Sequence, residues 1–157
     1  MLKTGRLCDI IDKNTGDEKM KKYNIIAVFD NKSELLLMCK RRKNPYKGLL
    51  NFVGGKIKEG EDGFFAAYRE LFEETSITEN DIKLSHLMDF TYHFDNCSLE
   101  VYVGRLNKEV EVFGSENELV WITPDKDFFD CTKFAGEGNI GHIMLHINMH
   151  KEELLSL

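Results

Sequence analysis

Three glutamates, Glu70, Glu73 and Glu74, have the residue type and spacing of a metal site. On a helix, positions i, i+3 and i+4 share one face, and like charges placed there are unfavourable by about 0.2–0.5 kcal/mol per pair. Anions toward the C-terminal half of a helix also oppose its dipole. A hard divalent cation such as Mg²⁺, which prefers oxygen ligands, removes both penalties. The spacing therefore predicts a metal site, and the alternative is a solvated acidic helix face.

The segment 55–77 around these glutamates resembles the signature of the Nudix family, G-x5-E-x7-R-E-U-x-E-E-x-G-U, in which U is aliphatic. The matching residues are Gly55, Glu61, Arg69, Glu70, Leu71, Glu73, Glu74 and Ile77. The one departure is Ser76, which stands where the family usually has glycine. Glycine adopts a left-handed helix end at little energy, and serine can do so with modest strain. We expect a small loss of stability and intact chemistry.

The resemblance implies the Nudix fold, an α/β (α+β) arrangement of a mixed β-sheet sandwiched between α-helices. It also implies hydrolysis of a nucleoside diphosphate linked to another group, with Mg²⁺ or Mn²⁺ activating water and neutralising the pyrophosphate. Carried over by position, Glu70, Glu73 and Glu74 would hold the metal together with the Gly55 carbonyl. One of the three glutamates would also act as the base toward water.

Two further roles follow from the same resemblance. Arg69 would pair with Glu70 or Glu61 and so orient a metal-binding carboxylate, although an ordinary surface ion pair is the alternative. An acidic residue outside the signature often completes the site, and the candidates are Glu116 and Glu118. Strand alternation favours Glu118 and the loop position favours Glu116, so the sequence leaves this choice open.

The residues before the signature carry the substrate prediction. The stretch 38–56 is similar to that of 8-oxo-dGTP hydrolases of the MutT type, with a basic segment, a glycine and then Asn51 shortly before Gly-Gly-Lys. Asn51 offers an acceptor and a donor with which to read a purine edge, and a local backbone cap is an equal alternative. Lys40, Arg41 and Lys56 are candidates to meet the substrate, although a solvated basic loop is the alternative. Phe29, Phe52 and Phe90 are candidates for base stacking or for the core.

The leading functional hypothesis is Mg²⁺-dependent hydrolysis of a nucleoside triphosphate, 8-oxo-dGTP or a related purine nucleotide, to a monophosphate and pyrophosphate. A second hypothesis keeps this chemistry and replaces the substrate by ADP-ribose or a dinucleoside polyphosphate. A third, from another class, is a non-catalytic nucleotide-binding module. The complete set of glutamates argues against the third, because a binding module gains nothing from a repulsive acidic cluster.

Two helices and several strands must position these residues. Apolar periodicity predicts helices over 62–76 and 141–153. The apolar stripe of the first consists of Phe65, Tyr68 or Ala67, Leu71 and Phe72. Runs of apolar and β-branched residues separated by turn residues predict the strands. The predicted strands are 7–11, 23–29, 35–39, 49–53, 82–94, 97–106, 110–113 and 119–123, with hairpins between 23–29 and 35–39 and, across Asp95-Asn96, between 82–94 and 97–106.

The remaining side chains add little chemistry. His142, His146 and His150 recur at four-residue spacing on the last predicted helix, but no glutamate stands between them as in H-E-x-x-H, so we expect a polar helix face. The four cysteines, with no C-x-x-C pair, predict reduced thiols in the core rather than a zinc site.

The composition disfavours several other classes of function. The 157 residues, 42% of them hydrophobic, are typical of one packed domain spanning 1–157. The formal charge of −6 disfavours nucleic acid as a partner. With no apolar run near the ~20 residues that span a bilayer and no signal-peptide pattern, we expect a soluble cytoplasmic protein that does not bind membranes. We expect a small-molecule nucleotide as partner and a monomer or a homodimer.

Overall fold

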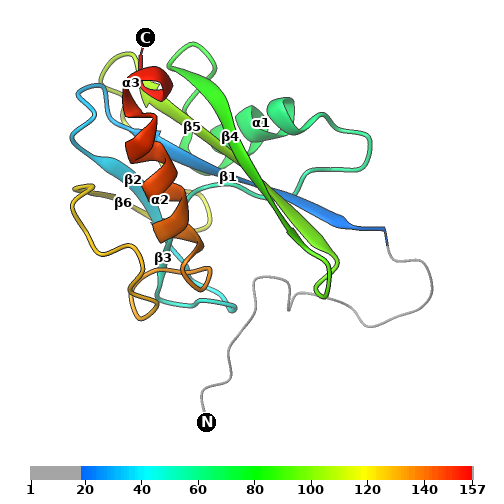
Figure 1. The fold of residues 1–157 in the computed structure, drawn as a ribbon. Helices are drawn as coiled ribbons and strands as arrows, with labels where there is room; N and C mark the ends of the chain where they lie inside the picture. Colours follow the sequence, from blue (N-terminus) through cyan, green and yellow to red (C-terminus); the bar gives the residue numbers. More distant parts are fainter. Residues whose placement is uncertain (1–18, 157) are drawn as a thin grey trace.

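The computed structural model describes residues 19–156, and its centre is a mixed β-sheet with helices on both faces (Figure 1). The strand order is β3-β2-β1-β5-β4, and β6 pairs with β2. The strands are β1 (Lys21–Phe29), β2 (Leu36–Lys40), β3 (Leu50–Asn51), β4 (Ile82–Tyr92), β5 (Cys97–Leu106) and β6 (Glu118–Ile122). The helices are α1 (Gly63–Thr75), α2 (Asn139–Met149) and α3 (Lys151–Leu154).

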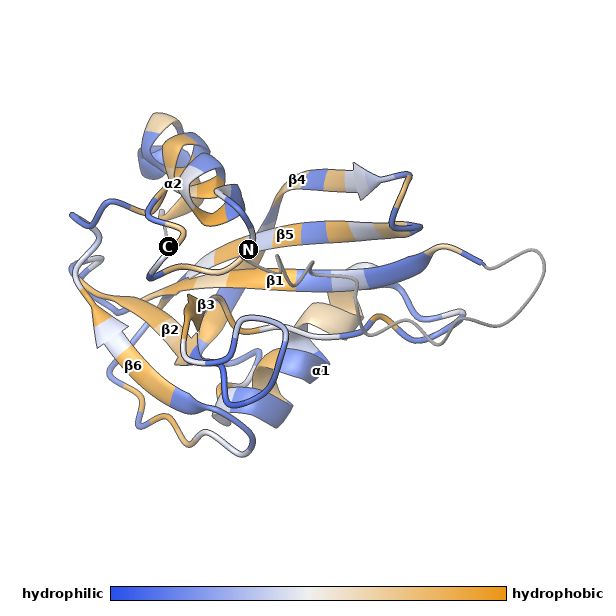
Figure 2. Cartoon of the chain, turned by 90° about the horizontal axis from the view of Figure 1, so that it is seen from below, coloured by the Kyte–Doolittle hydropathy of each residue, from blue (hydrophilic) through white to orange (hydrophobic). Residues whose placement is uncertain are grey.

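Strand β1 lies at the middle of the sheet, and from Asn24 to Phe29 it is buried on both faces. Ile25 and Phe29 pack in the core beneath α2, whereas Ile26 and Val28 pack in the core beneath α1. Such a strand is nearly continuous in apolar residues, as is usual where helices cover both faces of a sheet. Helices α1 and α2 indeed lie on opposite sides of the sheet (Figure 2), so the predicted fold class is confirmed.

The sheet owes its mixed character to the pairing of β1 with β5. These strands run parallel along the whole of β1, from Lys21 opposite Cys97 to Phe29 opposite Arg105. The predicted hairpin between β1 and β2 is present, although the two strands pair in register only at Phe29 and Leu36. The hairpin of β4 and β5 is also present and is antiparallel as predicted. Its last pair is Tyr92 with Cys97, so the turn includes His93 and Phe94 as well as the predicted two residues.

The buried face of α1 matches the prediction at Ala67 and Leu71 and differs from it at Phe65 and Phe72. Phe65 and Phe72 are 69% and 54% exposed, while Ala66, Ala67 and Leu71 are fully buried. The two alanines have short side chains, which let the helix approach the sheet closely. The phenylalanines share the apolar character expected of a core position but point to solvent.

Two element predictions need correction, and a third cannot be compared with the structure. Residues 110–113 form no strand, because the Phe113 N–H donates to the Thr75 carbonyl at the end of α1 instead of to a strand. The last helix starts at Asn139 and breaks at His150, whose N–H bonds to His146 and Ile147. The strand predicted at 7–11 lies outside the described residues.

The cysteines only partly match the expectation of reduced core thiols. Cys39 is a free, buried thiol, whereas Cys131 is free but exposed. Cys97 is disulfide-bonded, so the prediction is wrong at that position, and Cys8 lies outside the described residues. Within residues 19–156, no helix has the length and apolar character needed to cross a bilayer.

Candidate active site

Helix α1 carries the three glutamates, and both of its ends are fixed by local chemistry. Asp62 caps the N-terminus, since its carboxylate accepts hydrogen bonds from the N–H groups of Phe64 and Phe65 at 2.9 and 3.3 Å. At the other end Ser76 is left-handed, with φ = 65°, and its N–H donates to the Phe72 carbonyl at 2.9 Å. The serine thus takes the helix-ending conformation that the sequence requires of it.

Arg69 forms hydrogen bonds with three acidic residues of the site. Its Nε and Nη2 donate to the two carboxylate oxygens of Glu61 at 2.7 and 2.8 Å, a bidentate pair. Its Nη1 donates to Glu70 at 2.7 Å and to Glu73 at 3.2 Å, and Nη2 also reaches the Lys56 carbonyl. Arg69 therefore binds both predicted partners, and its hydrogen bonds lower the pKa of Glu61 to about 2.

The Gly54-Gly55 turn packs directly against the glutamates of α1. The Gly54 N–H donates to Glu74 Oε2 at 3.0 Å. A Cβ added to Gly55 would lie 2.2 Å from Glu70 Oε2, so any larger residue would force this carboxylate to move. The turn itself is held by Asn24, whose N–H donates to the Gly55 carbonyl at 2.9 Å and whose Oδ1 accepts from the Gly55 N–H at 3.1 Å. The Gly55 carbonyl keeps one lone pair for a further partner.

Glu74 is a largely buried carboxylate whose pKa is raised. Burial, which disfavours the charged form, is the main reason that its pKa is raised to about 7. The negative charges of Glu70 and Glu116 raise it further, whereas the Gly54 N–H and the positive charge of Arg41 act in the opposite direction. Negative charge is thus concentrated between the end of α1 and the Gly54-Gly55 turn.

Of the two candidates outside the signature, Glu116 is the one whose charge acts on this acidic centre. The segment before β6 is fastened to α1, because the Ser115 hydroxyl donates to the Glu73 carbonyl at 3.1 Å. Glu116, next along the chain, acts on the pKa of Glu74. Glu118 instead begins β6 as an exposed residue opposite Lys40. The structure therefore favours the loop candidate over the strand candidate.

The donor set fits a hard divalent cation, although its side chains are engaged in other bonds. In residues 19–156, no three His, Cys, Asp or Glu side chains converge as a metal-binding group. Arg69 binds Glu70 and Glu73, and Glu74 binds Gly54. All the candidate donors are carboxylate or carbonyl oxygens, which Mg²⁺ and Mn²⁺ prefer. The residues present could hold such an ion after a rearrangement of these flexible side chains.

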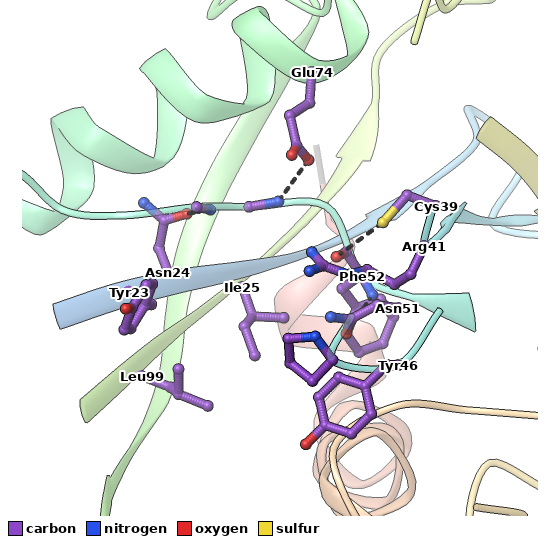
Figure 3. Close-up of a pocket in the computed structure, with 13 residues that line it drawn as sticks. Tyr23, Asn24, Ile25, Cys39, Arg41, Tyr46, Asn51, Phe52, Glu74 and Leu99 are labelled. Carbon is purple, nitrogen blue, oxygen red and sulfur yellow. Dashed lines mark hydrogen bonds between the residues drawn. The ribbon is translucent and has the colours of Figure 1, made fainter. Parts of the chain in front are cut away.

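A pocket adjoins the acidic centre and extends to an aromatic wall (Figure 3). Glu74, to which Gly54 is hydrogen-bonded, lies at one end of it, and Tyr46 lies at the opposite end. Arg41 reaches in between these ends, and its buried Nε has no hydrogen-bond partner in the described structure. The lining residues are Tyr23, Asn24, Ile25, Cys39, Arg41, Pro45, Tyr46, Asn51, Phe52, Gly54, Gly55, Glu74 and Leu99.

The predicted substrate-binding residues separate into two groups. Arg41, Asn51 and Phe52 line the pocket, whereas Lys40 and Lys56 are exposed and do not. Lys40 and Arg41 differ because neighbouring residues along an extended strand point to opposite sides, and these two lie at the end of β2. Phe29 is buried in the core, and Phe90 packs on the core and on His142 outside the pocket.

Asn51 uses its oxygen locally. Its Oδ1 accepts a hydrogen bond from the Phe52 N–H at 2.9 Å, which is the local capping role considered for it. The amide nitrogen remains as the group that can face a ligand, so a bidentate reading of a purine edge would require this bond to break.

The lining residues that were not predicted from the sequence include Tyr23, Asn24 and Tyr46. Asn24 carried a usable signal, because it is a polar residue inside an apolar strand and is 2% exposed. Tyr46 carried none, because its place depends on how the loop between β2 and β3 folds. His142 and His146 form an edge-to-face ring contact on the partly exposed face of α2, away from the pocket.

Comparison with known proteins agrees with this arrangement. The model of the NUDIX domain family matches residues 20–131, which is most of the chain. The chain therefore belongs to the NUDIX family, and the predicted family and enzyme class, a Nudix-type pyrophosphohydrolase, are confirmed.

Solved structures share the fold at low sequence identity. A Caenorhabditis elegans Ap4A hydrolase is 19% identical with a TM-score of 0.67, over 82% of this chain and 97% of the other. A MutT structure from work on Aliivibrio salmonicida and Vibrio cholerae is 18% identical with a TM-score of 0.60, over 82% and 98%. The Escherichia coli dihydroneopterin triphosphate pyrophosphohydrolase is 17% identical with a TM-score of 0.61, over 79% and 94%.

Proposed function

We propose that this protein hydrolyses a nucleoside triphosphate, 8-oxo-dGTP or a related purine nucleotide, to the monophosphate and pyrophosphate in the presence of Mg²⁺ or Mn²⁺. The observation that carries the proposal is the continuity of the pocket. Its aromatic and apolar wall suits a flat heterocycle, and Glu74, to which Gly54 is hydrogen-bonded, lies at its other end. A nucleotide with its base against the wall would extend its phosphates toward the acidic centre.

Each residue of the acidic centre would have a separate role in this reaction. Glu70, Glu73, Glu74 and the Gly55 carbonyl would hold the metal, with Glu116 as the further acidic ligand. The bound ion would lower the pKa of water and neutralise phosphate oxygens. Arg69 would keep the carboxylates oriented, and one of the glutamates would take the proton of the attacking water.

Arg41 is the group placed to meet the substrate's phosphates. Its guanidinium reaches into the pocket beneath the Gly54-Gly55 turn (Figure 3), and a guanidinium binds phosphate through paired hydrogen bonds. The Asn51 amide nitrogen would donate to an acceptor on the base. Phe52 supplies apolar surface at the same end of the pocket.

The names of the structural relatives bear on the choice of substrate. Ap4A and dihydroneopterin triphosphate both join a fused heterocycle to a chain of phosphates, as a purine triphosphate does. These likenesses support the general class of substrate and leave the second hypothesis, a nucleoside diphosphate derivative, as an outcome of the test. Cytoplasmic location and a monomeric or homodimeric state are further expectations.

A hydrolysis panel tests the proposal. The purified protein is incubated with 8-oxo-dGTP, dGTP, ADP-ribose and diadenosine tetraphosphate, with Mg²⁺, with Mn²⁺ and with chelator, and the products are identified. We expect metal-dependent turnover with the highest kcat/KM for 8-oxo-dGTP. Preference for ADP-ribose or the dinucleotide would keep the acidic centre but refute the proposed substrate. No turnover of any of the four would favour a binding module.

A further inference from the structure

The loop between β2 and β3 forms the wall of the pocket that lies farthest from the glutamates. Two backbone bonds close this loop: the Arg41 N–H donates to the Leu49 carbonyl at 2.9 Å, and the Gly48 N–H donates to the Arg41 carbonyl at 2.7 Å. Pro45, which is buried, and the half-buried Tyr46 line the pocket from the loop, and Figure 3 shows Tyr46 at the end of the pocket. The position of Tyr46 therefore sets the width of the pocket at this end.

Two side-chain contacts tie the loop to distant parts of the chain: the Arg42 N–H donates to Asn117 Oδ1 at 3.0 Å, and Tyr46 bonds to Glu137. The Tyr46 hydroxyl lies 2.8 and 2.7 Å from the two carboxylate oxygens of Glu137, to which it donates. Glu137 lies 91 residues later, in the turn before α2. A hydrogen bond to an ionised acceptor is about twice as strong as a neutral one. Glu137 is itself exposed, so core packing does not hold its side chain there.

Both partners have left-handed backbones, with φ = 67° at Tyr46 and φ = 50° at Glu137. For residues other than glycine this conformation is uncommon and unfavourable, and it persists where the surroundings enforce it. Such positions concentrate at functional sites. Strain on both sides of a single hydrogen bond indicates that the contact has a role beyond joining two surface loops.

We propose that Glu137 is a positioning residue that holds the Tyr46 ring as the wall against which the substrate's heterocycle packs. This inference rests on the proposed nucleotide substrate. A tyrosine ring offers a flat face on which any nucleobase stacks favourably. Without the Glu137 carboxylate the loop loses its tie to α2, so the heterocycle meets a mobile wall while the metal centre is unchanged. Binding weakens and the chemical step is retained.

The test compares Tyr46→Phe, Glu137→Ala and their double mutant with the wild type, using the best nucleotide of the hydrolysis panel. Tyr46→Phe keeps the ring and removes the hydroxyl. Each single variant should raise KM about tenfold with kcat within about twofold, as expected for one hydrogen bond to a charged group. The double mutant should be no worse than either single variant, because both remove the same contact.

Two further variants separate positioning from general damage. Glu137→Gln keeps an oxygen that accepts the tyrosine hydrogen bond, so it should restore most of the affinity lost in Glu137→Ala. The matched control is Glu152→Gln, which changes an exposed carboxylate on α3 and should leave KM unchanged.

Hydrogen exchange of the backbone gives a readout that needs no substrate. Amides of residues 41–49 should exchange faster in Glu137→Ala than in the wild type or in Glu152→Gln, while those of β1 and β5 stay protected. If the exchange rates of residues 41–49 were the same in Glu137→Ala and in the wild type, Glu137 would not hold the loop and the proposal would be refuted. Faster exchange with an unchanged KM would refute the role toward the substrate. A wild-type protein that hydrolyses no nucleotide contradicts the proposed function itself, whereas active variants with wild-type KM contradict only this inference.

Discussion

The substitution Gly55→Ala gives the sharpest test of how the turn supports the acidic centre. An added Cβ would lie 2.2 Å from Glu70 Oε2 and 2.5 Å from its Cδ, both far inside contact distance. Since non-bonded atoms rarely approach closer than about 3.2 Å, the Glu70 carboxylate must withdraw by about 1 Å. This movement also strains its 2.7 Å bond to Arg69.

Both consequences can be given a magnitude. A displacement of about 1 Å in a catalytic group lowers turnover by about a hundredfold. Loss of one hydrogen bond to a charged partner lowers the free energy of unfolding by about 1–2 kcal/mol. We therefore expect Gly55→Ala to fold, to unfold at modestly lower urea concentration and to lose about two orders of magnitude in kcat with Mg²⁺ present.

Gly60→Ala is the matched control because it lies in the same loop, between the turn and α1. Its φ of 76° makes alanine unfavourable by about 1 kcal/mol, but a Cβ there meets no atom within 4 Å. The control should lose comparable stability and keep its activity. If Gly55→Ala retained wild-type kcat, the space that Gly55 leaves beside Glu70 would not be needed for turnover and the reasoning would be refuted.

Three other predictions concern single side chains. Glu73→Gln should leave the melting temperature nearly unchanged and reduce kcat by orders of magnitude, and equal steady-state activity would remove Glu73 from the mechanism. Asp62→Ala removes the cap of α1 and should lower the free energy of unfolding by about 1 kcal/mol in urea titrations, whereas Asp62→Ser should recover most of it. Asp81 has a pKa lowered to about 2 by hydrogen bonds from Thr78 and by Lys108, so its stabilisation is complete above pH 4 and is lost as the pH falls toward 2. The stability difference between wild type and Asp81→Asn should therefore be full at pH 6 and shrink at pH 2.5, and a difference independent of pH would contradict this.

The local parts of the site could be predicted from the sequence because short-range rules determine them. The 3.6-residue period places Glu70, Glu73 and Glu74 on one helix, and the spacing from Arg69 brings its guanidinium to Glu61 and Glu70. The helix ends at Asp62 and Ser76 follow from capping rules. These features depend on residues within about two turns of one another.

The parts that the sequence did not predict depend on distant segments. No local pattern indicates that β1 pairs in parallel with β5, or that Phe113 bonds to the end of α1 instead of extending a strand. Tyr46 lines the pocket from a loop, and its hydroxyl bonds to Glu137, 91 residues away. The exposure of Phe65 shows the same limit, since two small alanines decide which face of α1 packs on the sheet.

The most direct test of the account is product identification for 8-oxo-dGTP with purified protein and saturating Mg²⁺. The account predicts one pyrophosphate and one 8-oxo-dGMP per substrate consumed, and loss of both products when the metal is chelated. Release of orthophosphate would contradict cleavage of the phosphoanhydride next to the nucleoside monophosphate. Turnover that persists in chelator would contradict the assignment of Glu70, Glu73 and Glu74 to a metal centre.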